Sequence, residues 1–244
     1  MITEILKTER NHYFSQFLIK NWVSEENKQN QVYVNIINPK YENEKLKRMA
    51  ATKQILFDKA IYDNDTEAQT SKDDSELAKL VHILKNNLYM NNLLFKNERF
   101  LQLLFKLFAR QPKLNKSFYD SIKKAILNEP YVAFCFKNFL NGSDKQFERW
   151  VNHQLFAFSI YDVELDYTKA KYKFYINKTQ KPFILPDNTK TLVLPLTPTI
   201  CVCLSDLTQT KATVEIEEIT DDTKVESINE TLIQNCDKFY ISKD

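Results

Sequence analysis

Gly142 is the only glycine in this chain of 244 residues, where average usage of about 7% would give about 17. Phosphate-binding loops, dinucleotide-binding turns and the nucleophile elbow of α/β-hydrolases all require glycine, either for a positive φ or for close approach of the backbone to a ligand. The sequence therefore argues against nucleotide-dependent motors, dinucleotide oxidoreductases and α/β-hydrolases. Gly142 itself follows Asn141, a pair that is typical of a tight turn.

Charge and hydropathy indicate the broad class. Lys and Arg total 34 against 32 Asp and Glu, a net charge of +2, so no strong overall field favours nucleic acid or an anionic membrane. No stretch approaches the roughly 18 apolar residues of a membrane span, and the chain opens without the apolar run of a signal peptide. We therefore expect a packed cytoplasmic protein with no membrane partner.

The cysteines are Cys135, Cys201, Cys203 and Cys236, and no two of them form a C-x-x-C pair. Zinc ligation is one interpretation, and buried reduced thiols in an intracellular chain are the other. The spacing favours the thiols, so we expect no metal and no cofactor.

The N-terminal part is predicted to hold one short helix and one strand. A helix is expected to begin near Ser15, followed by apolar residues at helical spacing. Alternating apolar residues predict a strand over 31–37. Residues 46–62 show no clear pattern, and a polar loop is expected up to about residue 74.

Longer helical runs follow, and they are 75–88, 92–110, 114–127 and 144–158. In the first run, one apolar face is formed by Leu77, Leu80, Val81, Leu84 and Leu88. The second run is apolar on most sides and is expected to be the central helix. Together with the N-terminal helix, these runs predict a bundle of about five helices.

After residue 162 the pattern changes to short β-branched or alternating runs. The expected strands are 172–176, 182–185, 192–194, 199–204, 213–219 and 238–242, with a helix over 225–236. We expect one antiparallel sheet. Helices followed by strands predict an α+β fold. It would form a single domain over 1–244, with a short N-terminal helix and strand (1–45), a helical bundle (75–160) and a β-rich part (170–244).

His12 is the first candidate for chemistry. It precedes the first helix, beside Tyr13 and one helical turn from Gln16. It can act as a general acid or base near neutral pH, or its ring can bond backbone carbonyls and hold the N-terminal segment in place. His82 and His153 have no His or carboxylate partner at zinc-ligand spacing, and we interpret both as structural.

Arg110 and Asp187 are the other candidates. Arg110 ends the most apolar helical run, where the helix dipole favours a cation, but a guanidinium can also clamp a phosphate. Asp187 and Asn188 lie in a turn set by Pro186. Asp in a turn commonly bonds its own backbone, whereas a carboxylate at a strand end is also where a His-orienting or metal-binding residue would lie.

Lysines alternate with tyrosines between residues 167 and 175. This pattern can line a groove for single-stranded nucleic acid, and it is also typical of an exposed strand edge protected by lysine, which we favour. The acidic stretch 215–222 is interpreted as a solvated strand face and loop.

Three segments carry a resemblance to a known family. Residues 11–22 contain His-Tyr followed by Leu-Ile-Lys-Asn-Trp, residues 108–112 read Phe-Ala-Arg-Gln-Pro, and residues 183–188 read Phe-Ile-Leu-Pro-Asp-Asn before Leu-Pro-Leu-Thr-Pro at 194–198. Together they resemble domain-of-unknown-function family 4238, an uncharacterised bacterial family. Four positions depart from its pattern, and they are Ser15 and Thr189, where the family has Pro, Trp22 for Phe, and Pro186 for Ser.

The resemblance covers nearly the whole chain in the same order and implies one domain. It also implies that His12, Arg110 and Asp187 are the polar members of the three signatures, which favours a shared site more than composition does. No activity comes with the family.

Two functions are therefore open. The first is an effector that cleaves RNA, another nucleic acid or a nucleotide without a metal, in a toxin or phage-defence setting and gated by a protein partner. Its catalytic residues would be His12, Arg110 and Asp187, and its substrate-binding residues Tyr13, Gln16 and Asn188. The second is a non-catalytic protein-interaction module in which the same residues form a structural network. A metal-dependent phosphodiesterase using Asp187 is disfavoured, because no ligand cluster is recognisable.

Overall fold

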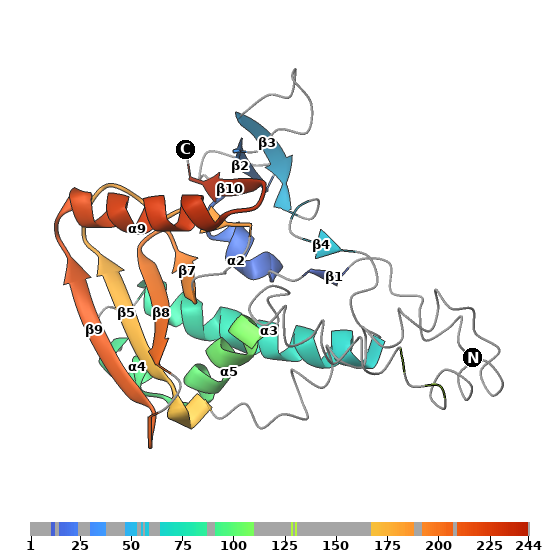
Figure 1. Ribbon diagram of the computed structural model, residues 1–244, viewed down its shortest axis with the longest axis vertical. Helices are drawn as coiled ribbons and strands as arrows, with labels where there is room; N and C mark the ends of the chain where they lie inside the picture. The colour runs from blue at the N-terminus through green and yellow to red at the C-terminus, as the bar shows by residue number, and fades with distance from the viewer. Residues whose placement is uncertain are drawn as a thin grey trace.

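The described part of the chain has an α+β fold, which confirms the predicted class (Figure 1). A computed structural model describes residues 11–12, 15–23, 30–37, 47–52, 55, 57–58, 64–86, 91–109, 128, 130, 167–187, 192–206 and 209–243. No helix among these residues is long and apolar enough to cross a membrane.

Among the described elements, strands predominate near the two ends of the chain and helices predominate in its middle. The helices are α2 (Gln16–Lys20), α3 (Asn64–Asn86), α4 (Asn91–Phe95), α5 (Glu98–Ala109), the 3-10 helix η4 (Tyr167–Lys169) and α9 (Asp222–Asn235). The strands are β1 (Asn11–His12), β2 (Gln31–Ile36), β3 (Lys47–Ala51), β4 (Phe57–Asp58), β5 (Lys171–Asn177), β6 (Leu185–Pro186), β7 (Val193–Thr197), β8 (Ile200–Asp206), β9 (Thr213–Ile219) and β10 (Phe239–Ser242).

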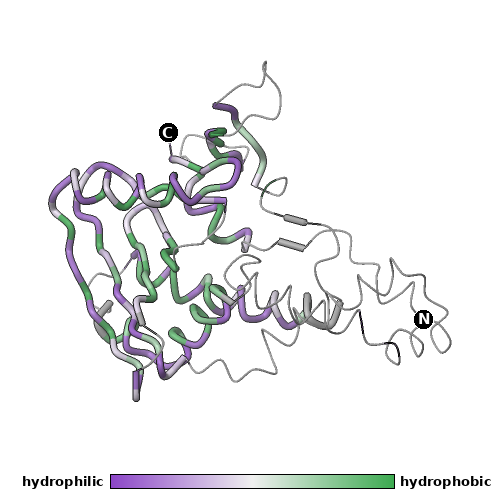
Figure 2. The backbone as a smooth tube through the Cα atoms, viewed as in Figure 1, coloured by the Kyte–Doolittle hydropathy of each residue, from purple (hydrophilic) through white to green (hydrophobic). Residues whose placement is uncertain are grey.

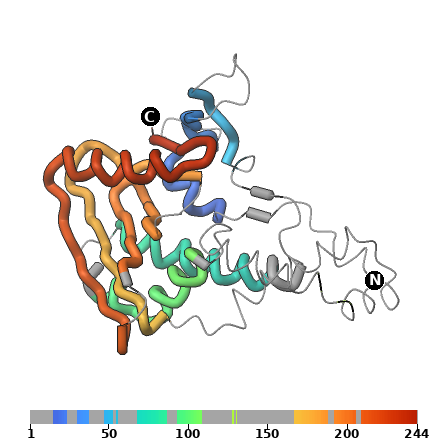
Figure 3. The backbone as a smooth tube through the Cα atoms, viewed as in Figure 1, coloured from blue at the N-terminus to red at the C-terminus, as the bar shows by residue number. Residues whose placement is uncertain are grey.

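Sheet 1 joins the two ends of the chain. Its strand order is β3-β2-β10-β6, with antiparallel pairing throughout. The predicted strand at 238–242 therefore pairs with the N-terminal strand β2 and does not extend the C-terminal sheet. Figure 3 shows this meeting of blue and red segments. Residues 182–184, expected in a strand, have irregular backbone, and only Leu185–Pro186 pairs with β10.

Sheet 2 has the order β7-β8-β5-β9. Strands β7, β8 and β5 are antiparallel as predicted, but β9 runs parallel to β5. The sheet is mixed because β5 lies between β8 and β9, two strands that follow each other in the chain. β8 runs antiparallel to β5, and the chain reverses direction between β8 and β9, so β9 runs parallel to β5.

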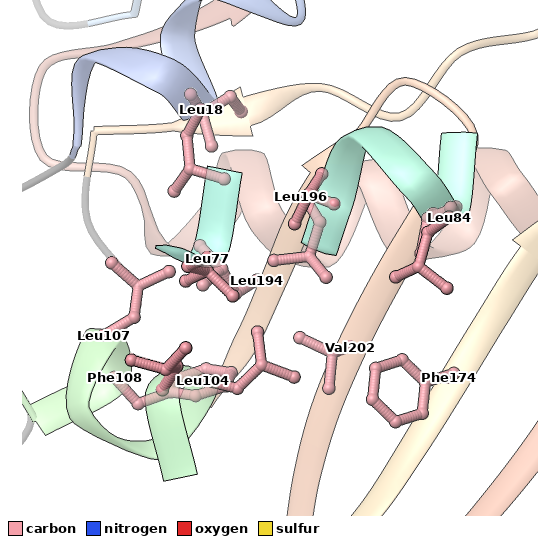
Figure 4. Close-up of a cluster of buried hydrophobic side chains, with 14 of the residues drawn as sticks. Leu18, Leu77, Leu84, Leu104, Leu107, Phe108, Phe174, Leu194, Leu196 and Val202 are labelled. Atoms are coloured by element: carbon pink, nitrogen blue, oxygen red, sulfur yellow. The ribbon is translucent and has the colours of Figure 1, made fainter. Parts of the chain in front are cut away.

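The main core lies between sheet 2 and the helices α3 and α5 (Figure 4). Leu77 and Leu84 of α3 and Leu104 of α5 pack on Val202 and Phe174 of the sheet. The ring of Phe174 also stacks on Phe95, with centroids 4.2 Å apart. Figure 2 shows the apolar residues gathered at this interface, where their burial supplies most of the stabilisation.

Helix α3 begins at Asn64, so the predicted loop before residue 75 is wrong. The predicted apolar face of Leu77, Val81 and Leu84 is buried as expected. One and two turns before Leu77, Asp73 and Thr70 respectively continue the same face and are also buried. Polar residues at core-facing positions conceal the helical period from a hydrophobicity pattern.

The helix expected over 92–110 is divided into α4 and α5. Asn97 begins the second helix, because its Oδ1 accepts the backbone N–H of Phe100 at 3.0 Å, as an N-cap does. The helices expected over 114–127 and 144–158 lie outside the described residues.

Candidate functional site

The structure places only some of the predicted site residues. The backbone of His12 pairs with Phe57 across the short β1–β4 ladder, and Gln16 begins α2. The side chain of His12 and all of Tyr13, Arg110 and Asn188 lie outside the described residues. A shared site of His12, Arg110 and Asp187 therefore stays a prediction.

Asp187 is buried, with 6% of its surface exposed. Its Oδ1 accepts the backbone N–H of Asp237 at 2.8 Å, and its Oδ2 accepts those of Lys238 at 2.7 Å and Phe239 at 3.3 Å. In return, the Asp187 N–H donates to the carbonyl of Phe239 at 3.1 Å. The carboxylate thus holds the turn between α9 and β10 through charge-assisted hydrogen bonds.

The irregular backbone before Asp187 forms hydrogen bonds with an amide side chain of α9. Asn229 donates from Nδ2 to the carbonyl of Pro182 at 3.0 Å, and its Oδ1 accepts the N–H of Ile184 at 3.1 Å. Buried backbone groups outside a sheet need such partners. Asn229 lies on the buried face of α9 between Val225 and Leu232. A polar residue on an otherwise apolar helix face is the signal that could have identified it.

Two residues of the N-terminal segment bond to the same region. The indole N–H of Trp22 donates to the carbonyl of Phe183 at 2.9 Å, and Asn21 Nδ2 donates to the carbonyl of Leu196 at 2.9 Å. The Phe183 N–H in turn donates to the carbonyl of Pro198 at 2.8 Å. The first and third segments of the sequence resemblance therefore meet in space, through main-chain and structural side-chain contacts. We call residues 182–187, with the side chains of Trp22, Asp187 and Asn229, the polar frame.

A second polar cluster joins α3 to α5. Arg99 bonds Glu76 through Nε at 3.0 Å and Nη2 at 2.5 Å, and Asp73 through Nη2 at 3.2 Å. Lys106 reaches the other oxygen of Asp73 at 3.0 Å. Asp73 is thus a buried carboxylate held between two cations, an arrangement that compensates the cost of its burial.

The predicted lysine edge on β5 is wrong, because β5 is flanked by β8 and β9. Lys171 pairs with Glu215 at 2.7 Å and Lys173 with Glu217 at 2.9 Å, and Glu217 also contacts Lys224. The acidic stretch supplies the partners of these lysines. Because the cations are already paired, this face does not favour a groove for single-stranded nucleic acid.

None of the described cysteines forms a disulfide bond. Cys201 and Cys236 are buried and Cys203 is partly buried, as the sequence predicts for structural thiols. Burial raises the pKa of the Cys201 thiol well above its ordinary value, and it also raises the pKa of Cys203. Neutral thiols are poor nucleophiles. Among the described residues, no three or more His, Cys, Asp or Glu side chains form a possible metal site.

Comparison with known protein families, curated proteins and solved structures found no match. The resemblance to domain-of-unknown-function family 4238 therefore stays an expectation from the sequence, and the function has to be argued from the geometry.

Proposed function

We propose that this chain is a non-catalytic protein-interaction module in which the polar signature residues hold the fold together. The observation that carries the proposal is the environment of Asp187, whose two carboxylate oxygens accept backbone N–H groups of three successive residues. A carboxylate that orients a catalytic histidine needs an oxygen directed at the imidazole. Both oxygens of Asp187 are engaged by backbone N–H groups of the turn before β10.

Exposed apolar side chains support the interaction part of the proposal. Leu93 of α4 is 72% exposed, Met49 of β3 is 45% exposed and Ile83 of α3 is 41% exposed. Single exposed apolar residues are common on soluble proteins. Met49 and Ile83 lie on elements that also carry charged side chains, as the rims of transient interfaces do.

Cleavage activity is the outcome that would overturn this proposal. The purified chain is incubated with total RNA, single-stranded DNA and nucleotides, beside a His12→Ala variant. We expect no cleavage by either protein, and a melting temperature several degrees lower for the variant if His12 belongs to the structural network, since about 1 kcal/mol corresponds to roughly 2–4 °C in a domain of this size. Degradation by the wild type that His12→Ala abolishes would favour the nuclease hypothesis.

A partner is sought by capture on the purified chain from its own cell extract, followed by reconstitution of the complex from two pure proteins. We expect a saturable complex measurable by calorimetry. The Asp221→Asn variant keeps a capping side chain at the N-cap of α9. It should therefore bind the partner as the wild type does. If no purified partner binds in any condition, the proposal is wrong.

A further inference from the structure

We propose that the outer edge of β9 binds an extended partner segment as an added strand, and that this segment alternates basic with apolar residues. The inference deepens the proposed function and rests on it, because it assigns a surface and a partner chemistry to the interaction module. Strand addition to a sheet edge is a recurring mode of peptide recognition.

The direction of the β9 backbone groups follows from two backbone hydrogen bonds at its ends. The N–H of Thr213 donates to the carbonyl of Ala170 at 3.2 Å, and the carbonyl of Ile219 accepts the N–H of Lys178 at 2.8 Å. Odd-numbered residues of β9 thus direct their backbone groups toward β5. The N–H and C=O of the alternate residues Val214, Ile216 and Glu218 therefore point away from the sheet, because each strand residue directs both groups to one side.

The position of β9 makes those groups a docking edge. β9 is the last strand of sheet 2 and has seven residues, all of them in register with β5. Among the described residues no strand lies on its other side, and Figure 1 shows β9 at the border of the sheet. The opposite edge differs, since Asn21, the residue after α2, donates to the carbonyl of Leu196 in β7.

The side chains of β9 indicate what would pair with it. Glu215 and Glu217 lie on one face, with 50% and 30% of their side chains exposed. Val214 and Ile216 lie on the other face and are partly buried against the core. Side chains on an added strand lie beside those of β9 on the same face. Basic residues are therefore favoured next to the glutamates, and apolar residues on the other face.

The existing neighbour of β9 shows the same complementarity. β5 presents Lys171 and Lys173 to Glu215 and Glu217, and alternates them with Tyr172 and Phe174 on the core face. Glu215 pairs with one lysine, and Glu217 pairs with Lys173 and Lys224. An ionised carboxylate has about four acceptor positions, so each glutamate can accept a further cation from the other side. The internal pairing is thus a template for the chemistry of the partner.

A second copy of the chain fits this edge less well. Antiparallel pairing of two β9 strands about Ile216 would place Glu215 of one copy opposite Glu217 of the other. Like charges directly opposite each other destabilise a strand pair. The charge pattern therefore favours a basic segment over self-association.

The test uses the full-length chain and a fluorescein-labelled seven-residue peptide that alternates lysine and valine. We expect saturable binding by fluorescence anisotropy, weakened by salt, and none for the same peptide with glutamate in place of lysine. Two further peptides carry N-methylated backbone amides, one at its lysines and the other at its valines. Only one set of N–H groups on a strand faces its neighbour. One methylated peptide should therefore lose binding and the other keep it.

Two protein variants locate the site. Glu218→Pro removes an outward N–H from an exposed residue, and Glu218→Ala is its matched control, because both lose the contact of Glu218 with Lys178. We expect the peptide to bind Glu218→Pro about threefold to tenfold more weakly than Glu218→Ala, the contribution of one hydrogen bond. Circular dichroism verifies that both variants fold. If Glu218→Pro does not fold, the paired methylated peptides decide the question with the wild type.

Three outcomes would overturn the inference. They are no binding of the lysine–valine peptide, equal binding of both methylated peptides, and equal affinity of the two Glu218 variants. Self-association of the wild type that Glu218→Pro abolishes would overturn it too, in favour of a second copy. If a purified partner binds but the peptide does not, the inference about β9 is wrong, whereas the proposed interaction module is not contradicted. If neither a purified partner nor the peptide binds, both the inference and the proposed function are wrong.

Discussion

At the scale of single residues, Asp187 offers the sharpest test of the polar frame. In Asp187→Asn one carboxylate oxygen becomes an amide N–H₂, so at least one of the N–H groups of Asp237, Lys238 and Phe239 faces another donor in either orientation of the amide. A buried donor without an acceptor costs about 1–3 kcal/mol. We expect the melting temperature to fall by about 2–12 °C, at roughly 2–4 °C per kcal/mol for a domain of this size.

The control for Asp187→Asn is Asp221→Asn. Asp221 is exposed, and its side chain accepts the N–H of Thr223 at 2.9 Å to cap α9. Asn caps a helix about as well as Asp, so scanning calorimetry should show little change. Equal shifts for the two variants would mean that the Asp187 hydrogen bonds contribute no special stability.

The sequence marks Asp187 as a residue of interest but does not identify its partners. Asp in a turn set by proline predicts a backbone hydrogen bond, and the carboxylate does bind backbone. The bonded turn lies beyond a whole helix, however, and no local pattern connects the two. The same holds for Trp22, whose apolar spacing predicts burial whereas its bond to Phe183 depends on the tertiary fold.

At the scale of elements, the buried ion pair between α3 and α5 should be worth more than the exposed pairs of sheet 2. The pair Lys106–Asp73 has side chains 18% and 3% exposed, against 35% and 50% for Lys171–Glu215. We expect a double-mutant cycle with Asp73→Asn and Lys106→Met to give a coupling of about 1–2 kcal/mol. A parallel cycle on Lys171 and Glu215 should give less than about 1 kcal/mol. Equal couplings by urea unfolding would contradict this ranking.

The contact of Arg99 with Glu76 predicts a pH dependence. The hydrogen bond from Arg99 lowers the pKa of Glu76 below its ordinary value of 4.5. Because the folded pKa is the lower one, the stabilisation is present above the unfolded value and is lost as the pH falls through the folded value. Since Glu76 is 43% exposed, we expect an effect below about 1 kcal/mol.

The measurement is the difference in melting temperature between the wild type and Glu76→Gln, taken from pH 7 down to about pH 3. This difference should shrink toward zero at the acid end. The control is Glu230→Gln on the exposed side of α9, where the difference should stay small throughout. A gap for Glu76→Gln that persists at the lowest pH would contradict the assignment.

Elements with a clean period are the ones that sequence patterns predict well. β9 was expected over 213–219, the bounds that the structure has, because alternating apolar and charged residues lie between polar turns. The first turns of α3 were missed because Thr70 and Asp73 occupy core-facing positions. Asp73 is compensated by Arg99 and Lys106 from another helix. Such compensation is a tertiary property that a local window cannot contain.

At the scale of the whole molecule, the sequence predicts the α+β class but not the division of the described strands into sheet 1, sheet 2 and the β1–β4 pair. Strand patterns indicate which residues are extended, whereas pairing depends on contacts between distant parts of the chain. The pairing of β2 with β10 is the clearest case, since β2 lies near the N-terminus and β10 near the C-terminus. One buried cluster includes residues from both sheets and from α2, α3 and α5. This continuity supports the prediction of a single domain.

Trp22→Phe tests that prediction, because the indole N–H bonds Phe183 at the junction of the two sheets. The variant keeps an aromatic ring but leaves the carbonyl of Phe183 without this donor, at a cost of about 1–3 kcal/mol. In a single cooperative domain, amide exchange should accelerate by the same factor in β8 and β10, because both strands open in one global transition. The control is Tyr240→Phe, at a half-buried position in sheet 1. It should leave the amide exchange rates of β8 and β10 unchanged. Acceleration confined to β10 would mean that the two sheets unfold separately, and the chain would then be two cooperative units joined at the polar frame.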